Sequence, residues 1–304
     1  MNILLIGASK FIGSHLLDRL IGNDEIKKVT YTYFSQNYFE HHKERKISYS
    51  KCDVTDPNNI TDNIFNAKAE IIVYMASSRY FPEPKDRNDH ANININGMKN
   101  LVKSCKEYKK NSKVIFLNSG ASKLNLENKQ FDYGSYAKSK KSASEIFNSS
   151  KNKGDINGTE LNLYTPYGPK DYSYRLIQSS VIEILNGRLP KLNNPNSHRD
   201  FIYIDDVIDV LEKVILSRKN FESIDVGTSK STSNQDVLKE IYKVMNIEKS
   251  INLSKKINTE QITHMKADLA VAKNLLNWEP KTDIKKGIYN TVNWIKENYK
   301  NYYE

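Results

Sequence analysis

The sequence predicts an α/β fold: a doubly wound parallel sheet with helices on both faces, followed by a smaller mixed α/β part. Over the first 160 or so residues, short apolar runs alternate with segments of helical periodicity, a pattern typical of parallel strands joined by crossover helices. Beyond Pro169 the pattern becomes mixed, and no repeat or low-complexity linker separates the two parts. We therefore expect domains at residues 1–169 and 170–304, with some later elements returning to the first domain.

The apolar runs and helical periods assign the elements in order. Strands are predicted at residues 2–7, 27–33, 46–52, 70–76, 113–118 and 159–164, and helices between them at 11–22, 57–66, 89–110 and 134–153. Further helices are predicted at 172–187, 205–218, 234–246, 266–276 and 283–299, separated by short strands. The polar segments 36–46 and 123–134 are expected to be loops near the functional site.

A glycine turn joins the first strand to the first helix. The run from Asn2 to Ile6 ends at Gly7, and Gly13 lies just inside the helix that follows. Gly7 allows a tight turn and Gly13 allows close helix packing, while the helix N-terminus offers N–H groups to a pyrophosphate. Lys10 replaces the middle glycine of this pattern, so its side chain either crowds the pyrophosphate or pairs with it.

Tyr136 and Lys140 lie four residues apart on a predicted helix, and therefore on one helix face. An ammonium beside a phenol favours the phenolate and allows the pair to act as a general acid or base. In a lysine-rich chain this spacing also fits a solvated helix face, so it needs support from other segments. Two segments provide it: an apolar strand that ends at Ser119, and the stretch from Arg199 to Val207, whose Arg suits a bidentate phosphate contact.

Together these segments resemble the extended short-chain dehydrogenase/reductase family of NAD(P)-dependent nucleotide-sugar epimerases, dehydratases and 4-ketoreductases. The resemblance covers nearly the whole chain. It also rests on segments that begin at Cys52, Met75, Asn94, Tyr164, Asp225 and Leu275. It implies a Rossmann-type sheet, a nucleotide-diphosphate sugar as substrate and a homodimer formed through the helices near 89–110 and 134–153.

The resemblance also implies roles for individual residues. Tyr136 exchanges the proton with the sugar oxygen, Lys140 lowers the Tyr pKa and binds the nicotinamide ribose, and Ser119 hydrogen-bonds the reacting oxygen, with Ser122 as the reserve candidate. The expected cofactor contacts are Gly7, Ser9, Lys10, Phe11, Ile12, Gly13, Thr32, Ser35, Asp53, Val54, Met75, Ala76, Ser77, Asn94, Tyr136, Lys140 and Thr165. The expected substrate contacts are Arg79, Ser119, Thr165, Arg199 and Tyr203.

Two of these residues have a competing structural role. Asp53 is expected to accept from the adenine amino group, yet it also suits a loop-capping position. Arg199 is expected to hold the substrate diphosphate, and an ion pair with Asp200 or Asp206 is the less favoured alternative.

The residues after the second strand bear on the choice of cofactor. An acid that would hold an NAD ribose 2′-hydroxyl is missing, and the first acid after the strand is Glu40. Thr32, Ser35 and Asn37 suit a 2′-phosphate, and Lys43 or Arg45 lies within reach in the sequence. These residues favour NADP, and NAD stays open because no Arg follows the strand directly.

The reaction type is narrowed by the residues that follow Ser119. A 4,6-dehydratase of this family needs an acid/base carboxylate pair there, and this chain has Gly120 and Ala121, which argues against dehydration. A 4-ketoreductase that consumes NADPH is favoured, and a 4-epimerase with tightly bound NAD is the alternative. A non-catalytic dinucleotide-binding regulator is a third hypothesis, motivated by Lys10 and by Asn162, where many family members have Arg. The sugar itself is not predicted.

Composition excludes several other classes of protein. Hydrophobic residues make up 38% of the chain, enough for a core, and no run reaches the ~18 apolar residues of a membrane span. Two cysteines without metal-ligand spacing indicate a cytoplasmic protein with no disulfide framework and no metal. The net charge of +10 is spread along the chain, so we expect no nucleic-acid partner.

Overall fold

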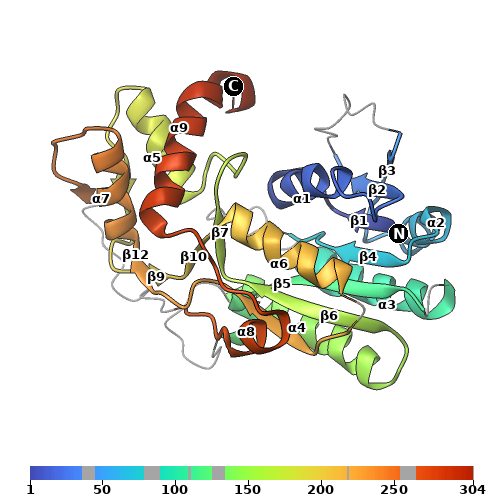
Figure 1. The fold of residues 1–304 in the computed structure, drawn as a ribbon. Helices are drawn as coiled ribbons and strands as arrows, with labels where there is room; N and C mark the ends of the chain where they lie inside the picture. Colours follow the sequence, from blue (N-terminus) through green and yellow to red (C-terminus); the bar gives the residue numbers. More distant parts are fainter. Residues whose placement is uncertain are drawn as a thin grey trace. The chain divides into compact units, whose positions relative to one another are not determined.

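The computed structural model describes residues 1–35, 45–78, 90–108, 111–124, 134–217, 219–253 and 265–303 (Figure 1). Contacts between residues divide the chain into two units. Unit 1 comprises Met1–Glu127, Tyr133–Leu163 and Val210–Asp225, and unit 2 comprises Asn128–Asp132, Tyr164–Asp209 and Val226–Glu304. Unit 1 therefore takes back a segment from late in the chain.

Unit 1 is built on a seven-stranded sheet with the order β11-β6-β5-β4-β1-β2-β3. Its strands are β1 (Asn2–Ile6), β2 (Lys28–Tyr33), β3 (Ile47–Lys51), β4 (Ile71–Tyr74), β5 (Lys113–Ser119), β6 (Asn157–Leu163) and β11 (Ser223–Val226). The ladders on both sides of β1 are parallel, with Ile3 opposite Val29 on one side and Ile71 on the other. The strand order reverses between β1 and β4, the place where doubly wound sheets bind their ligands.

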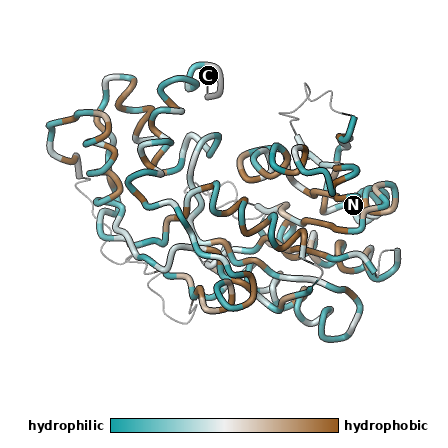
Figure 2. Tube along the Cα trace, in the orientation of Figure 1, coloured by the Kyte–Doolittle hydropathy of each residue, from teal (hydrophilic) through white to brown (hydrophobic). Residues whose placement is uncertain are grey.

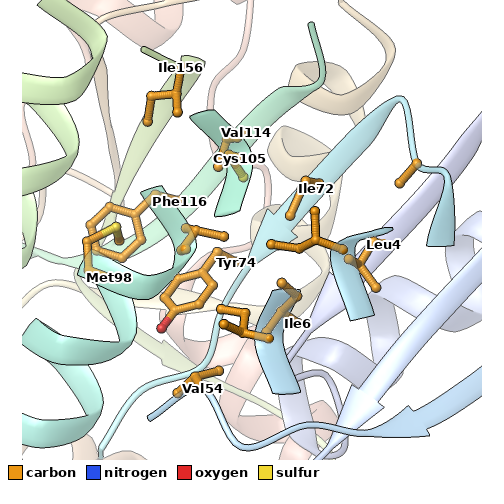
Figure 3. Close-up of a cluster of buried hydrophobic side chains, with 14 of the residues drawn as sticks. Leu4, Ile6, Val54, Ile72, Tyr74, Met98, Cys105, Val114, Phe116 and Ile156 are labelled. Atoms are coloured by element: carbon orange, nitrogen blue, oxygen red, sulfur yellow. The ribbon is translucent and has the colours of Figure 1, made fainter. Parts of the chain in front are cut away.

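One face of this sheet is covered by α2 (Pro57–Ala67), α3 (Gly97–Tyr108) and α4 (Gly134–Asn152). Asp56 begins α2 by accepting from Asn58 N and Asn59 N, with Pro57 in the first turn. Figure 3 shows the core beneath these helices, which includes Met98, Tyr74 and Phe116. The centroids of the Tyr74 and Phe116 rings lie 6.1 Å apart. A π-helical turn, η2 (Ala91–Asn96), leads into α3.

The other face is covered by α1 (Phe11–Ile21) and the second half of α6 (Ile204–Leu216). The Arg19 guanidinium pairs with the Glu212 carboxylate at 2.7 Å and links the two helices. Figure 2 shows hydrophobic residues along β1 and β4, consistent with strands that are buried on both faces.

Unit 2 contains short strand pairs and a group of helices. The strands are β7 (Thr165–Tyr167), β8 (Lys191–Leu192), β9 (His198–Arg199), β10 (Phe201–Tyr203), β12 (Thr232–Ser233) and β13 (Asn252–Leu253). The helices are α5 (Leu176–Leu185), α7 (Asn234–Val244), α8 (Ala270–Leu276) and α9 (Ile284–Tyr303). β7 pairs with β10 in parallel, and β9 pairs with β12 antiparallel. α5, α7 and α9 pack against one another.

The predicted parallel α/β fold is confirmed, with element bounds close to those expected. Two helices begin later than predicted, and the one predicted at 172–187 also ends earlier, because α5 spans Leu176–Leu185. The segment predicted as a helix from 266 becomes helical only at Ala270. Of the predicted helix 89–110, the described part runs from His90 to Tyr108 and begins with the π-helical turn. The predicted loops lie largely outside the described residues, at 36–44 and 125–133.

Candidate active site

The glycine turn between β1 and α1 lies at the switch point of the sheet. Gly7 has a φ of +79°, and a Cβ there would lie 2.6 Å from the Ala76 Cα at the end of β4. A Cβ at Gly13 would lie 2.2 Å from the Ala8 carbonyl oxygen. Only glycine fits either position, because backbone atoms occupy the space. Lys10 is the N-cap residue of α1 and makes no side-chain capping bond. The turn therefore presents the helix N-terminus at the place where a pyrophosphate would bind.

Thr32 lies beneath this turn. Its side chain is 1% exposed, and its hydroxyl accepts from Gly7 N at 3.0 Å, while Ala8 N donates to the Thr32 carbonyl. Thr32 therefore supports the glycine turn, and its buried side chain is bonded to the backbone of this turn. Ser35 and the Phe34 ring are exposed at the end of β2 and lie at the surface, where a ribose substituent would reach them.

Asp53, after β3, has the capping geometry that the sequence suggested as its competing role. One carboxylate oxygen accepts from Thr55 N at 2.9 Å and from the Thr55 hydroxyl at 2.7 Å. Val54 is buried beside Gly97, and its carbonyl accepts from the Asn100 side chain. The geometry assigns Asp53 a structural role in this loop, in addition to any contact with a cofactor.

Asn94 connects the end of β4 to α4. Its side-chain oxygen accepts from the Ser77 hydroxyl at 3.2 Å and from Ser78 N at 3.0 Å. Its amide nitrogen donates to the Ser139 hydroxyl at 2.9 Å, and Ser139 donates to the Tyr136 carbonyl at 2.7 Å. At the other end of this segment, Met75 N donates to the Ile6 carbonyl in β1. The residues expected to line the cofactor trough are thus bonded to the helix that carries Tyr136.

Tyr136 and Lys140 lie one turn apart on α4 in very different surroundings. Tyr136 is partly exposed, whereas Lys140 is 3% exposed, with its Nζ 5.8 Å from the centroid of the Phe116 ring. Burial lowers the pKa of Lys140 from 10.5 to about 8, and the Glu160 carboxylate opposes this shift. The ammonium form of Lys140 therefore depends on a nearby negative charge.

Glu160 is a site residue that the sequence analysis missed. It is 2% exposed on β6, and its two oxygens accept from Asn118 Nδ2 at 2.6 Å and Asn148 Nδ2 at 2.8 Å. Asn118 Nδ2 also lies 3.5 Å from the Lys140 carbonyl. The available signal was an ionisable residue in the middle of a predicted strand, because a carboxylate is rarely buried in a strand without a partner.

Ser119 ends β5 and begins a 3-10 turn, η3 (Gly120–Lys123), that packs against α4. The Ser119 hydroxyl accepts from Ala121 N at 3.2 Å and is partly exposed. The reserve candidate Ser122 donates to the Ser119 carbonyl at 2.8 Å, which uses its hydroxyl within the turn. Lys123 closes the turn with an ion pair to the buried Asp225. Of the two serines, Ser119 is the better placed to bind a substrate oxygen.

His90, just before η2, is a second residue that the sequence analysis missed. Its ring is 3% exposed and lies 5.5 Å, centroid to centroid, from the ring of Tyr136. A histidine in a polar segment gave no periodic signal that would have singled it out.

The expected substrate contacts lie mostly in unit 2. Thr165 is 8% exposed on β7, and its N–H donates to the Asp200 carbonyl at 2.9 Å. Arg199 is partly exposed on β9, whereas Tyr203 is 5% exposed on β10 with its ring 5.7 Å from Tyr167. Burial raises the pKa of Tyr203 to about 12. Arg79 lies outside the described residues.

The two acids expected to compete for Arg199 are both engaged by backbone groups. The Asp200 carboxylate accepts from Thr228 N, Ser229 N and Ala267 N at 2.6–3.0 Å. The Asp206 carboxylate accepts from Lys281 N and Thr282 N at 2.9 and 3.0 Å. Both acids therefore hold segments of unit 2 together.

The family follows from these features and from comparison with known proteins. A model of the NAD dependent epimerase/dehydratase family matches residues 3–227, which include the glycine turn, Ser119, Tyr136 and Lys140. The chain belongs to this family. It is similar to the UDP-glucuronate 4-epimerase of Thermodesulfobacterium geofontis, with 26% identity over 97% of this chain and 96% of the relative.

Solved structures of other epimerases and dehydratases share the fold. The UDP-glucuronic acid 4-epimerase of Bacillus cereus, in complex with UDP-glucuronic acid and NAD, matches with a TM-score of 0.86 at 21% identity, covering 98% of this chain and 100% of that one. The dTDP-glucose 4,6-dehydratase of Bacillus anthracis, in complex with NAD, matches with a TM-score of 0.85 at 20% identity, covering 100% and 99%. This chain is therefore an enzyme of the epimerase/dehydratase family.

Two kinds of feature are not found in the part of the chain that the structure describes. No group of three or more His, Cys, Asp or Glu side chains there has the arrangement of a metal site. Among the same residues, no helix has the length and apolar character that crossing a membrane requires.

Proposed function

We propose that this enzyme transfers hydride at C4 of a nucleotide-linked sugar and acts as a 4-ketoreductase that uses NADPH. The observation that carries the proposal is the arrangement around α4. A partly exposed Tyr136 lies one turn from the buried Lys140, and the turn that follows Ser119 packs against the same helix. These side chains have the chemistry needed to bind a carbonyl oxygen and give it a proton.

The protein's own groups have separate tasks in this reaction. The Ser119 hydroxyl and the Tyr136 phenol bind the C4 carbonyl oxygen and polarise the C=O bond. A bound nicotinamide supplies the hydride to C4, which is chemistry of the cofactor. The Tyr136 phenol transfers its proton to the oxygen, and the ammonium of Lys140 stabilises the phenolate that remains.

The fit of a dinucleotide rests on the glycine turn. The exposed Gly7 and the N-terminus of α1 form a cradle for the diphosphate, and Gly7 keeps this turn tight because a Cβ there would collide with Ala76. Lys10 and the first turn of α1 would hold the diphosphate there, and Asn94 and Ser77 would line the nicotinamide side. The same cradle suits NAD and NADP, so the choice depends on the end of β2.

NADPH is favoured by the residues at the end of β2. Tyr33, Phe34 and Ser35 carry no carboxylate in the region where an NAD-specific protein of this fold usually places one. Side chains without a negative charge do not repel a ribose 2′-phosphate. A reductase needs this cofactor in exchangeable form, because each turnover consumes one reduced nicotinamide.

A 4-epimerase with tightly held NAD is the second candidate. It is favoured by the comparisons, because the relative in Thermodesulfobacterium geofontis is a UDP-glucuronate 4-epimerase that aligns over nearly its whole length. The same three side chains serve it: Tyr136 would first accept the proton of a C4 hydroxyl and then return it after the sugar has turned its other face.

The state of the purified protein separates these candidates. Native mass spectrometry shows which cofactor the purified protein retains. Titration with NAD, NADH, NADP and NADPH, followed by nicotinamide fluorescence, then shows which cofactor it binds. An empty protein that prefers NADPH, and then reduces a UDP-, dTDP-, GDP- or CDP-linked 4-keto-6-deoxy sugar, would support the reductase. NAD that survives purification would support the epimerase.

The variant Tyr136→Phe tests whether Tyr136 takes part in turnover. It removes the phenol oxygen and keeps the ring, so cofactor binding should persist while turnover falls by about 10²- to 10⁴-fold. Unchanged biological activity with cofactor still bound would contradict both enzymatic candidates and favour the regulator.

We also propose that the enzyme is a homodimer.

A further inference from the structure

His90 touches the proposed catalytic tyrosine from outside α4. The two ring planes meet at 69°, edge to face, with their centroids 5.5 Å apart. His90 Nδ1 lies 2.7 Å from the Ser78 hydroxyl, just beyond the end of β4. The imidazole is 3% exposed, so its position is set by its neighbours in the protein. It therefore bridges the end of the strand and the face of α4 that carries Tyr136.

A second route joins the same two places through hydrogen bonds. Ser78 N donates to Asn94, Asn94 donates to Ser139, and the Ser139 hydroxyl donates to the Tyr136 carbonyl. This route ends on the backbone of Tyr136 and fixes the helix. It does not restrain rotation about the side-chain bonds of Tyr136, which decide where the phenol oxygen lies.

The ring contact with His90 acts directly on the side chain of Tyr136. An edge-to-face pair favours a limited set of mutual orientations, and the buried imidazole is itself oriented by the bond to Ser78. Proton transfer requires the donor oxygen to lie within hydrogen-bond reach of the substrate oxygen. A ring packed against the phenol reduces the number of rotamers that a partly exposed tyrosine adopts.

We propose that His90 is a positioning residue that holds the ring of Tyr136 in the orientation from which the phenol transfers its proton. The inference rests on the proposed function, and it assigns to His90 a part in that reaction through Tyr136. The orienting element is the imidazole ring as an aromatic body. The bond between Nδ1 and Ser78 serves to fix this ring.

Three substitutions separate the ring from the hydrogen bond. His90→Phe keeps an aromatic edge against Tyr136 and loses the bond to Ser78. His90→Asn keeps a polar group near Ser78 and loses the ring. His90→Ala loses both. If the ring is the orienting element, Phe retains most of the wild-type behaviour, whereas Asn and Ala behave alike.

The first readout does not need turnover. 3-Fluorotyrosine placed at residue 136 reports the surroundings of this ring by ¹⁹F NMR in the full-length protein. We expect a signal displaced from the free amino acid in the wild type and in His90→Phe. The signal should move toward the free value in His90→Asn and His90→Ala. An unchanged signal in His90→Ala, or one retained by Asn and lost by Phe, would overturn the proposal.

The second readout is turnover of the 4-keto sugar. In His90→Ala and His90→Asn, kcat should fall by about 10- to 100-fold, while KM and the Kd of the cofactor stay within about twofold of wild type. A parallel loss of cofactor binding would indicate a general structural role and would also overturn the proposal. If the ¹⁹F signals follow the expected order but the wild type turns over no sugar, the ring contact stands and the proposed function fails.

Discussion

Lys140 is an ionisable side chain in a place that disfavours its charge. Burial lowers its pKa to about 8, and the buried Glu160 raises it. Three other titratable groups lie near this site. Glu160 also raises the pKa of Lys151, further along α4. His90, just before η2, faces the ring of Tyr136, and Lys123 of η3 forms an ion pair with Asp225. The mechanism requires the ammonium, so kcat/KM should decline as the pH rises above about 8.

Replacement of Glu160 by Gln tests this dependence. The amide keeps the shape and removes the charge, so the pKa of Lys140 falls and the alkaline limb of kcat/KM moves to lower pH. We expect activity at pH 8 to fall by roughly threefold or more, with little change near pH 6.5. The measurement is a pH profile of kcat/KM. Glu145→Gln on the exposed side of α4 is the control, and an equal shift in both variants would contradict the assignment.

At the residue scale, the sequence pointed to the proposed reacting groups but not to the residues proposed to tune them. Tyr136, Lys140 and Ser119 stand in motifs, and motifs are visible along the chain. His90 contacts the ring of Tyr136, and Glu160 raises the pKa of Lys140; these pairs are 46 and 20 positions apart in the sequence. Such contacts depend on which strand and helix meet, and a single sequence does not contain that information in local form.

At the scale of elements, the helix α1 depends on close approach to the turn that precedes it. A Cβ at Gly13 would lie 2.2 Å from the Ala8 carbonyl oxygen, so Gly13→Ala must push the helix away from the turn. We expect a loss of about 1–3 kcal/mol of unfolding free energy, together with weaker dinucleotide binding. Denaturant titration and nicotinamide fluorescence measure the two effects.

Gly134→Ala is the matched control for this substitution. Gly134 is at the start of α4, and a Cβ there meets nothing within 4 Å. Its stability should stay the same or rise slightly, because alanine favours a helix. Equal losses of unfolding free energy from both substitutions would contradict the view that Gly13 is needed for the close approach of α1 to the turn.

The end of α6 is held by a single lysine from β5. Lys113 Nζ donates to the carbonyls of Val214, Ser217 and Lys219 at 2.6–2.9 Å. Lys113→Met keeps the stem and leaves these carbonyls without this donor, so we expect a loss of about 1.5–3 kcal/mol in denaturant titration. Lys28→Met, at the exposed start of β2, should change stability by less than about 0.5 kcal/mol.

The elements themselves were largely predictable from the sequence. Apolar runs and helical periods gave the order of strands and helices in unit 1, because the central strands β1 and β4 are buried in a parallel sheet. The π-helical start of α3 was not predictable, since its backbone bonds are set by tertiary contacts such as those of Asn94. The short strands of unit 2 are two or three residues long, which leaves no period to detect.

At the scale of the whole molecule, the proposed homodimer has a direct test. Sedimentation equilibrium should give about twice the chain mass of 35.1 kDa at micromolar concentration. A single species at the mass of one chain, over the same range and with the cofactor present, would refute the homodimer. The enzymatic proposal does not depend on this result.

The discontinuity of unit 1 has a consequence for the newly made chain. The sheet acquires its strands in order as far as β6, but the neighbour of β6 is β11, which follows the first part of unit 2. On the ribosome, β6 therefore remains an open sheet edge until residues Ser223–Val226 emerge. Unpaired edges invite pairing with other chains, so this interval is when the protein is most prone to aggregate. A chaperone that shields β6 during synthesis would protect the protein at its most vulnerable stage.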